Sequence, residues 1–337
     1  MRRGRSRVLA AASTALFVSC AGLTSSGPAG AAHVPALDQP LGIAASGAHI
    51  WVANAKGNSV SEFDVTSGAL VRTIARTSDG FDSPIAIGAN RSNVWVANKI
   101  GNSLTELNAK TGALERIVKG PSYHFADPIG LAFSGPYLWV ANETGGLSEI
   151  SAINGALIRV VSARVGDFDN PVDVTLSGHT VWVANEAGDS LSEIHAANGT
   201  LVRSISSTGA FVAPIGLAAG AQSLWVSAAS GNGVAELDAS SGALVRFLTA
   251  ARYRFNAPWN IIIDRTHLWV VNANGNSVTE LDTTTGTLIR VISGHKYGFD
   301  NPIDLVAVGN EIWVANGAGN SLTVLNATTG ALIHYLR

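Results

Sequence analysis

Cysteine is almost absent from this 337-residue chain, since Cys20 in the N-terminal segment is the only one. No disulfide can form within the chain, so packing and hydrogen bonds must hold its fold together. Charge is also scarce: charged residues make up 14% of the chain, and the net charge is −2. No basic stripe follows the N-terminal segment, which argues against a nucleic acid partner.

Motifs that carry catalysis are missing as well. The eight histidines are scattered without metal-ligand spacing, and the chain has no G-x-S-x-G, P-loop, C-x-x-C or H-E-x-x-H motif. We therefore expect no bound metal, no cofactor and no catalytic residue of a familiar type.

The N-terminal segment has the pattern of an export signal. Four arginines precede an apolar run over residues 8–18, which is too short to span a bilayer, and Ala29-Gly30-Ala31 offers a cleavage site. We expect a signal peptide over residues 1–32, a short linker over 33–39 and a secreted or cell-surface protein. Phe17-Val18-Ser19-Cys20 also resembles a bacterial lipobox, so a lipid anchor at Cys20 is the alternative to soluble secretion and the only expected membrane contact.

What the chain has in abundance is a repeat. Seven tryptophans recur at intervals of 43 or 44 residues, and six of them begin W-V-A-N or W-V-V-N. They are Trp51, Trp95, Trp139, Trp182, Trp225, Trp269 and Trp313. A period of this length is typical of a stacked or radial repeat fold.

Each repeat contains four short β-rich stretches separated by turn signals. In the first repeat they cover residues 40–45, 50–54, 59–64 and 70–74, with Gly-containing turns between them. Four strands repeated seven times predict an all-β, seven-bladed β-propeller with four antiparallel strands per blade over residues 40–337. The small apolar first stretch suits the inner strand and the polar fourth stretch the outer edge. We expect a monomer whose blades are contiguous in sequence, without a strand exchanged between the first and last blades.

One pair of charges repeats with the blades. In six repeats a Glu in the third stretch precedes an Arg in the fourth by ten residues, which places the two side chains opposite each other in a hairpin. The pairs are Glu62–Arg72, Glu106–Arg116, Glu149–Arg159, Glu193–Arg203, Glu236–Arg246 and Glu280–Arg290, and the seventh repeat has Val324 and His334. Because every acid has its own base, we interpret them as structural ion pairs between blades, not as metal or catalytic ligands.

Departures from the repeat are the best guide to a site. The second residue after the repeat proline is small in four blades but polar in three, where it is Asp173, Asn260 and Asp304. Trp259 also replaces an aliphatic residue beside Asn260. We expect Trp259, Asn260 and Asp304 to meet at the channel mouth with Asp173 across it, as candidate ligands for a sugar, a cation or a peptide amine. Solvated polar groups lining a wet channel are the simpler interpretation. The Asn of each W-V-A-N is interpreted as a turn cap that bonds its own backbone.

The unit Pro128-Ile129-Gly130-Leu131-Ala132, followed by Leu138-Trp139-Val140-Ala141-Asn142, resembles the repeats of YVTN-type and NHL-type propellers. It is also similar to the repeat of virginiamycin B (streptogramin) lyase, whose family uses Mg²⁺, a His just after the proline and Glu residues after the Trp strand. The resemblance covers residues 40–337 and implies the fold.

The lyase chemistry does not carry over. The residues after the prolines are Leu41, Ile85, Ile129, Val172, Ile215, Trp259 and Ile303, and none is His. The positions of the family's Glu hold Asn or Ala, while Glu143 and Glu186 stand one residue later. We therefore expect a non-enzymatic binding or scaffolding module for a protein, peptide or glycan. The alternative is a lyase-like or hydrolytic enzyme that uses Asp173 and Asp304.

Overall fold

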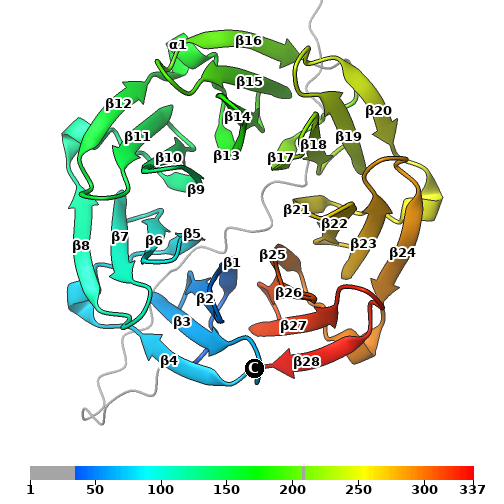
Figure 1. Ribbon diagram of the computed structural model, residues 1–337, viewed down its shortest axis with the longest axis horizontal. Helices are drawn as coiled ribbons and strands as arrows, with labels where there is room; N and C mark the ends of the chain where they lie inside the picture. Colours follow the sequence, from blue (N-terminus) through cyan, green and yellow to red (C-terminus); the bar gives the residue numbers. More distant parts are fainter. Residues whose placement is uncertain (1–34, 207–208) are drawn as a thin grey trace, which may run out of the picture. The chain divides into compact units, whose positions relative to one another are not determined.

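The computed structural model describes residues 35–206 and 209–337, and the compact unit that holds them spans Val34–Arg337. The chain forms seven four-stranded antiparallel sheets arranged around a central axis, and each sheet uses four consecutive strands (Figure 1). The predicted seven-bladed β-propeller is thus confirmed, and among the described residues no strand is exchanged between the first and last blades. No helix among the described residues is long and apolar enough to cross a membrane.

The first two strands of each blade lie nearest the axis. The inner strands are β1 (Pro40–Ser46), β5 (Pro84–Ala89), β9 (Pro128–Ser134), β13 (Pro171–Ser177), β17 (Pro214–Ala219), β21 (Pro258–Asp264) and β25 (Pro302–Val308). The second strands are β2 (His49–Asn54), β6 (Asn93–Asn98), β10 (Tyr137–Asn142), β14 (Thr180–Asn185), β18 (Ser223–Ala228), β22 (His267–Asn272) and β26 (Glu311–Asn316).

The remaining elements complete each blade and link it to the next. The third strands are β3 (Ser59–Asp64), β7 (Ser103–Asn108), β11 (Leu147–Ser151), β15 (Ser190–His195), β19 (Gly233–Asp238), β23 (Ser277–Asp282) and β27 (Ser321–Asn326). The outer strands are β4 (Leu70–Ile74), β8 (Leu114–Lys119), β12 (Leu157–Val161), β16 (Leu201–Ser206), β20 (Leu244–Leu248), β24 (Leu288–Ser293) and β28 (Leu332–Leu336). One-turn helices in the linking loops are η1 (Thr77–Asp79), η2 (Pro121–Tyr123), α1 (Ala163–Gly166), η3 (Ala251–Tyr253) and η4 (His295–Tyr297).

The repeated tryptophans form the cores between blades. All seven have no exposed surface. Trp95 of the second blade, for example, packs in one cluster with Leu138 and Val140 of the third. A sheet with two apolar faces must bury both, and the radial arrangement does so by giving each blade two neighbours. The regular spacing of tryptophan therefore follows from the packing of the blades.

The Glu–Arg pairs lie opposite each other on the third and fourth strands. Glu149 pairs with Arg159 in the β11–β12 ladder, and Arg159 Nε lies 2.5 Å from Glu149 Oε2. Several of these arginines also reach the next blade: Arg290 Nη2 donates to Thr328 O at 2.9 Å. In the seventh blade Val324 faces His334 in the same register. Each ion pair thus stabilises a hairpin, and the Arg stem covers the adjoining blade.

The Asn of W-V-A-N does not cap a turn in the expected way. Asn272 Nδ2 donates to the hydroxyls of Ser277 and Thr279 on the third strand, at 3.2 and 3.0 Å. Thr279 in turn donates to Tyr253 O in the loop that enters the blade, at 2.9 Å. The turn-cap prediction is wrong in this blade because the alternating hydroxyls of the third strand lie closer to this amide than its own turn does. In the third blade the prediction holds in part, since Asn142 Nδ2 donates to Gly146 O of its own turn at 3.1 Å. The amide and hydroxyls tie the entry loop to the blade.

The ring closes through the residues just before the first inner strand. Leu37, which the sequence places in the linker, is 4% exposed and packs in one cluster with Trp313 and Val324 of the seventh blade. The backbone N–H of Gln39 donates to Asn320 Oδ1 at 2.7 Å. Equivalent bonds join other neighbouring blades, as from Asn301 N to Asn276 Oδ1 at 2.8 Å. The seam therefore repeats an ordinary junction between blades.

Replacing Asn320 with Gly is expected to lower the free energy of unfolding by about 1 kcal/mol, since the seam loses one hydrogen bond. Gly accepts the positive φ of 47° at this position, so backbone strain does not add to the loss. Asn276→Gly removes the same bond at the junction of blades six and seven and should cost a similar amount in urea titrations. A neutral Asn320→Gly beside a destabilised Asn276→Gly would show that closure does not depend on this bond.

Candidate functional site

The three polar departures lie where the inner strands bulge. After each repeat proline the pairing of the first and second strands shifts register, as between Pro171 and Asp173 or between Pro258 and Ile261. A bulge frees backbone groups from the ladder and re-aims the side chains beside it. The inner strands that carry these bulges lie around the axis of the propeller (Figure 1).

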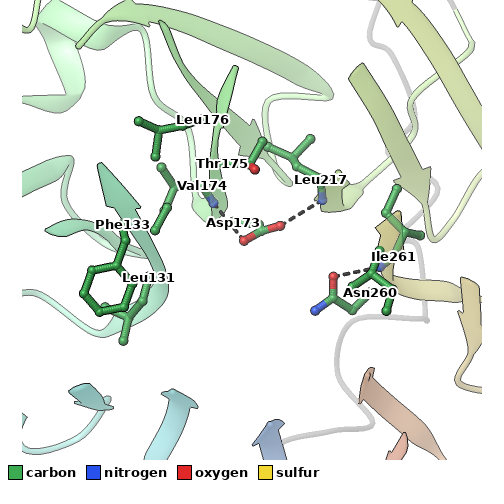
Figure 2. Close-up of a pocket in the computed structure, with 11 residues that line it drawn as sticks. Leu131, Phe133, Asp173, Val174, Thr175, Leu176, Leu217, Asn260 and Ile261 are labelled. Atoms are coloured by element: carbon green, nitrogen blue, oxygen red, sulfur yellow. Dashed lines mark hydrogen bonds between the residues drawn. The ribbon is translucent and has the colours of Figure 1, made fainter. Parts of the chain in front are cut away.

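Asp173 joins two blades through its carboxylate. Oδ1 accepts the N–H of Val174 in its own strand at 2.8 Å, and Oδ2 accepts the N–H of Leu217 on β17 at 2.8 Å (Figure 2). Both donors follow a bulge. A side chain with two acceptor oxygens can satisfy both at once, which explains an Asp where other blades carry Gly or Ala.

Asn260 and Asp304 form a second, larger network. Asn260 Oδ1 accepts the N–H of Ile261 at 2.7 Å, and its Nδ2 donates to Asp304 Oδ1. Asp304 also accepts the N–H groups of Leu305 at 2.8 Å and of Ile43 at 2.9 Å. The network therefore links blades six, seven and one, and it adds a polar contact at the seam of the ring.

The side chain of Trp259 lies in different surroundings from that of its polar neighbour, Asn260. Its half-buried side chain packs against the apolar clusters on both sides of its blade and does not line the central cavity. Its carbonyl oxygen accepts a hydrogen bond from Ser227 Oγ, which also accepts the N–H of Gly216 at 2.8 Å. Consecutive residues on a strand point to opposite sides, so the indole and the Asn260 amide diverge.

Blade five departs furthest from the W-V-A-N motif, and no single sequence motif explains this departure. Ser227 replaces the Ala of W-V-A-N, and Ala228 replaces its Asn. Gly216 faces the next blade so closely that an added Cβ would lie 2.7 Å from Trp259 O and 3.0 Å from Asn260 Oδ1. Glycine at this position makes room for the backbone of the following blade, as it does at Gly42, where an added Cβ would lie 2.7 Å from Ile85 O.

A cavity of about 390 Å³ lies between the inner strands of blades three to six. Most of its lining residues are apolar, but polar atoms make up more of its exposed wall than apolar atoms do, and its polar side chains are Asp173, Asn260 and Thr175 (Figure 2). The apolar lining consists of Leu131, Ala132, Phe133, Val174, Leu176, Leu217, Ile261 and Ile262. Trp259 and Asp304 are outside this lining, so two of the four candidate residues, Asp173 and Asn260, face the cavity.

The two carboxyl groups share an unusual electrostatic environment. Burial raises the pKa of Asp173 to about 7, and the negative charge of Asp304 adds to this shift. Burial raises the pKa of Asp304 to about 6, against the hydrogen bonds from Ile43 and Leu305 that lower it. Among the described residues, no Lys, Arg or His lines the cavity. The acids therefore hold backbone donors but have no cation beside them, and both titrate near neutral pH.

Glu143 and Glu186, which stand one residue after the positions where the similar lyase family has Glu, take part in other contacts. Glu143 pairs with Lys99 of the neighbouring blade, and Glu186 Oε2 accepts Asn170 Nδ2 at 3.0 Å. Asp189 accepts the N–H of Ala213 at 2.7 Å, in the place of the Asn that joins other blades. Among the described residues no group of three or more His, Cys, Asp or Glu side chains is placed to hold a metal ion.

Comparison with solved structures places the fold among known propellers. A streptogramin B lyase structure aligns with a TM-score of 0.70 and 17% identity, over 84% of this chain and 92% of that one. Hydrazine synthase from Kuenenia stuttgartiensis aligns with a TM-score of 0.74 and 17% identity, over 90% and 100%. A functionally unknown protein from Desulfotomaculum acetoxidans DSM 771 aligns with a TM-score of 0.70 and 14% identity, over 86% and 95%. At such identities the likeness concerns the fold alone.

None of the curated proteins matches this sequence. A family model described as YNCE-like β-propeller matches residues 7–336, which is nearly the whole chain. The chain therefore belongs to the YNCE-like β-propeller family.

Proposed function

We propose that this protein is an exported, non-enzymatic binding module whose central cavity holds a small molecule or the end of a peptide or glycan. The observation that carries the proposal is the cavity of about 390 Å³ between blades three and six. Its volume lies in the range of small-molecule sites, and a few fixed polar groups set among apolar residues are typical of them. A folded protein does not fit such a space, but a side chain or chain end does.

The hydrogen bonds of the acids favour binding over catalysis. Asp304 accepts three donors, and Asp173 holds backbone N–H groups of two blades. A general base needs a free carboxylate and a partner that orients or activates it, and no His or Lys lines the described cavity. The side chains that depart from the repeat therefore shape and rigidify a pocket.

Thr175→Trp tests the pocket by filling it. Thr175 lines the cavity and is partly exposed to it, so an indole there should exclude a ligand without removing a hydrogen bond of the ring. We expect some compounds of a library of amines, sugars and short peptides to raise the melting temperature of the wild type but not of Thr175→Trp. Thr180→Trp, on the second strand outside the cavity, is the matched control. A library in which no compound distinguishes wild type from Thr175→Trp would contradict the proposal.

An enzyme that uses Asp173 and Asp304 is the second candidate, and their raised pKa values favour it. Carboxyl groups that titrate near neutral pH are frequent among general acids and bases. A compound that binds should be recovered chemically unchanged after prolonged incubation, as checked by mass spectrometry. Turnover of a lactone or glycan that disappears in Asp304→Ala would instead establish the enzyme.

Export to the cell surface or beyond is proposed from the N-terminal pattern, which lies outside the described residues. We expect the mature protein to begin after Ala32 and to carry no lipid. Mass spectrometry of the N-terminus from native cells tests this expectation. A mature chain that starts at an acylated Cys20 would show a membrane-anchored lipoprotein.

A further inference from the structure

The central cavity is polar at one level and apolar beyond it. Asp173 and Asn260 occupy the same position in their inner strands, two residues after the proline, so they lie at the same level of the channel. The apolar lining residues Phe133 and Leu176 come three residues later in theirs. A ligand that fills this space needs a polar head and an apolar body.

The polar level carries negative charge without a counter-charge. Asp173 and Asp304 stand at equivalent positions, and the charge of Asp304 acts on Asp173. The lining of the described cavity contains no Lys, Arg or His. A buried carboxylate without a cation is costly, and a ligand that brings the cation removes that cost.

Asp173 also keeps unused acceptor sites. An ionised carboxylate accepts about four hydrogen bonds, and the described contacts of Asp173 are the N–H groups of Val174 and Leu217. Figure 2 shows the Asp173 carboxylate facing the open space of the cavity, with the Thr175 hydroxyl on a neighbouring part of the wall. Asp304 has fewer acceptor sites left, because its carboxylate accepts hydrogen bonds from three donors.

We infer that the cavity binds an organic ammonium ion, a protonated primary amine on an apolar body, with the ammonium group on Asp173 and the body against Phe133 and Leu176. This inference rests on the proposed binding function and names its ligand class. The ammonium group supplies three donors and one positive charge, which match the free acceptors and the missing counter-charge. The body displaces water from the apolar wall.

The charge sets the expected preference among ligands of equal shape. A neutral alcohol offers one donor and no charge, and its hydrogen bond to a carboxylate lacks the charge assistance of an ammonium ion. A carboxylate ligand meets two acids of its own sign. We therefore expect an amine to bind at least tenfold more tightly than the matching alcohol, and an anionic analogue to bind least.

The test compares 2-phenylethylamine, 2-phenylethanol and 3-phenylpropionate by isothermal titration calorimetry with the full chain at pH 8. Wild type should prefer the amine to the alcohol by at least tenfold. Asp173→Asn should lose this preference and keep the affinity for the alcohol. Asp264→Asn is the matched control, because Asp264 ends the inner strand β21 outside the cavity lining and should leave the preference unchanged.

Folding of the variant is checked by circular dichroism. Should Asp173→Asn unfold at the working temperature, Asp173→Gly replaces it, since Gly130 and Gly216 occupy the same position in blades three and five. Wild-type binding of the alcohol without any preference for the amine would overturn the inference and leave the binding function standing. A wild type that binds none of the three probes, or an amine preference that survives in Asp173→Asn, would also overturn it.

Discussion

Arg159→Ala is expected to lower the free energy of unfolding by about 3–5 kcal/mol, the usual result of leaving a buried charge without its partner. Glu149, its partner, has a side chain that is 3% exposed, and the two groups lie 2.5 Å apart. Burial already raises the pKa of Glu149 against the lowering effect of Arg159, so removal of the Arg raises it further. Urea unfolding at pH 7 measures the loss.

The seventh blade supplies a matched control for this prediction. Val324 and His334 occupy the positions of Glu149 and Arg159, and the blade keeps the same strand pairing. The double variant Glu149→Val, Arg159→His copies this pair and should recover most of the stability that Arg159→Ala loses, because no buried charge remains. An unchanged unfolding midpoint in Arg159→Ala would show that the pair is not coupled to the fold.

Raising the pH from 5 to 8 is expected to destabilise the protein by about 3–4 kcal/mol through Asp173 and Asp304. Their pKa values are raised to about 7 and about 6 in the folded state, while the ordinary pKa of an Asp side chain, 3.8, applies in the unfolded chain. Between these values the folded state binds more protons than the unfolded state, so the free energy of unfolding falls as the pH rises. Urea titrations across this range measure the slope.

Burial also raises the pKa values of five Glu residues of the ion pairs, and these shifts add to the same slope: Glu62, Glu106, Glu149, Glu236 and Glu280. Acids whose pKa values are lowered act outside this interval. Hydrogen bonds from Ser or Thr side chains and turn N–H groups lower the pKa values of Asp64, Asp238 and Asp282. The stability that these acids contribute is present above their unfolded pKa and is lost in stronger acid, well below pH 5. Asp173→Asn should therefore reduce the slope between pH 5 and 8, whereas Asp264→Asn should leave it intact. Stability that rises from pH 5 to 8 in both the wild type and Asp264→Asn would contradict the assignment of this slope to Asp173 and Asp304.

The propeller was predictable because the residue types that recur in its repeat are those that the packing of the blades requires. Each Trp stands mid-strand at a fully buried position, so the 43–44-residue period of Trp is also the period of the blades. The Glu–Arg pairs could be predicted from the sequence for a related reason. Two residues opposite each other in a hairpin have a fixed separation in sequence, and Val324 with His334 shows that they change together.

Contacts between blades were harder to foresee, because they join residues that no local rule relates. The bond from Leu217 N to Asp173 spans 44 residues, and the bond from Ile43 N to Asp304 spans 261. They depend on bulges in the inner strands, and a bulge has no clear sequence signature here. Alternation along the inner strand separates Trp259 from Asn260, so the aromatic platform expected beside the polar groups does not line the cavity.

Two signals for other features were present in the sequence. In the other six blades a Phe in the entry loop stands three residues before the repeat proline: Phe81, Phe125, Phe168, Phe211, Phe255 and Phe299. Leu37 stands three residues before Pro40 in the same way, and this spacing points to the seam that Leu37 closes. The Asn of W-V-A-N bonds hydroxyls five and seven residues later. Blade five loses all three groups together, with Ala228, Gly233 and Ala235 in their places.

The titration of Asp173 tests the account of the central cavity most directly. Carbon-13 NMR of labelled aspartates can follow its carboxyl group in the free protein and in the presence of 2-phenylethylamine. We expect a pKa near 7 in the free protein and a clear decrease when the amine binds, because a bound cation favours the charged carboxylate. A pKa near 4 in the free protein, unchanged by the amine, would contradict both the uncompensated charge and the ligand proposed for it.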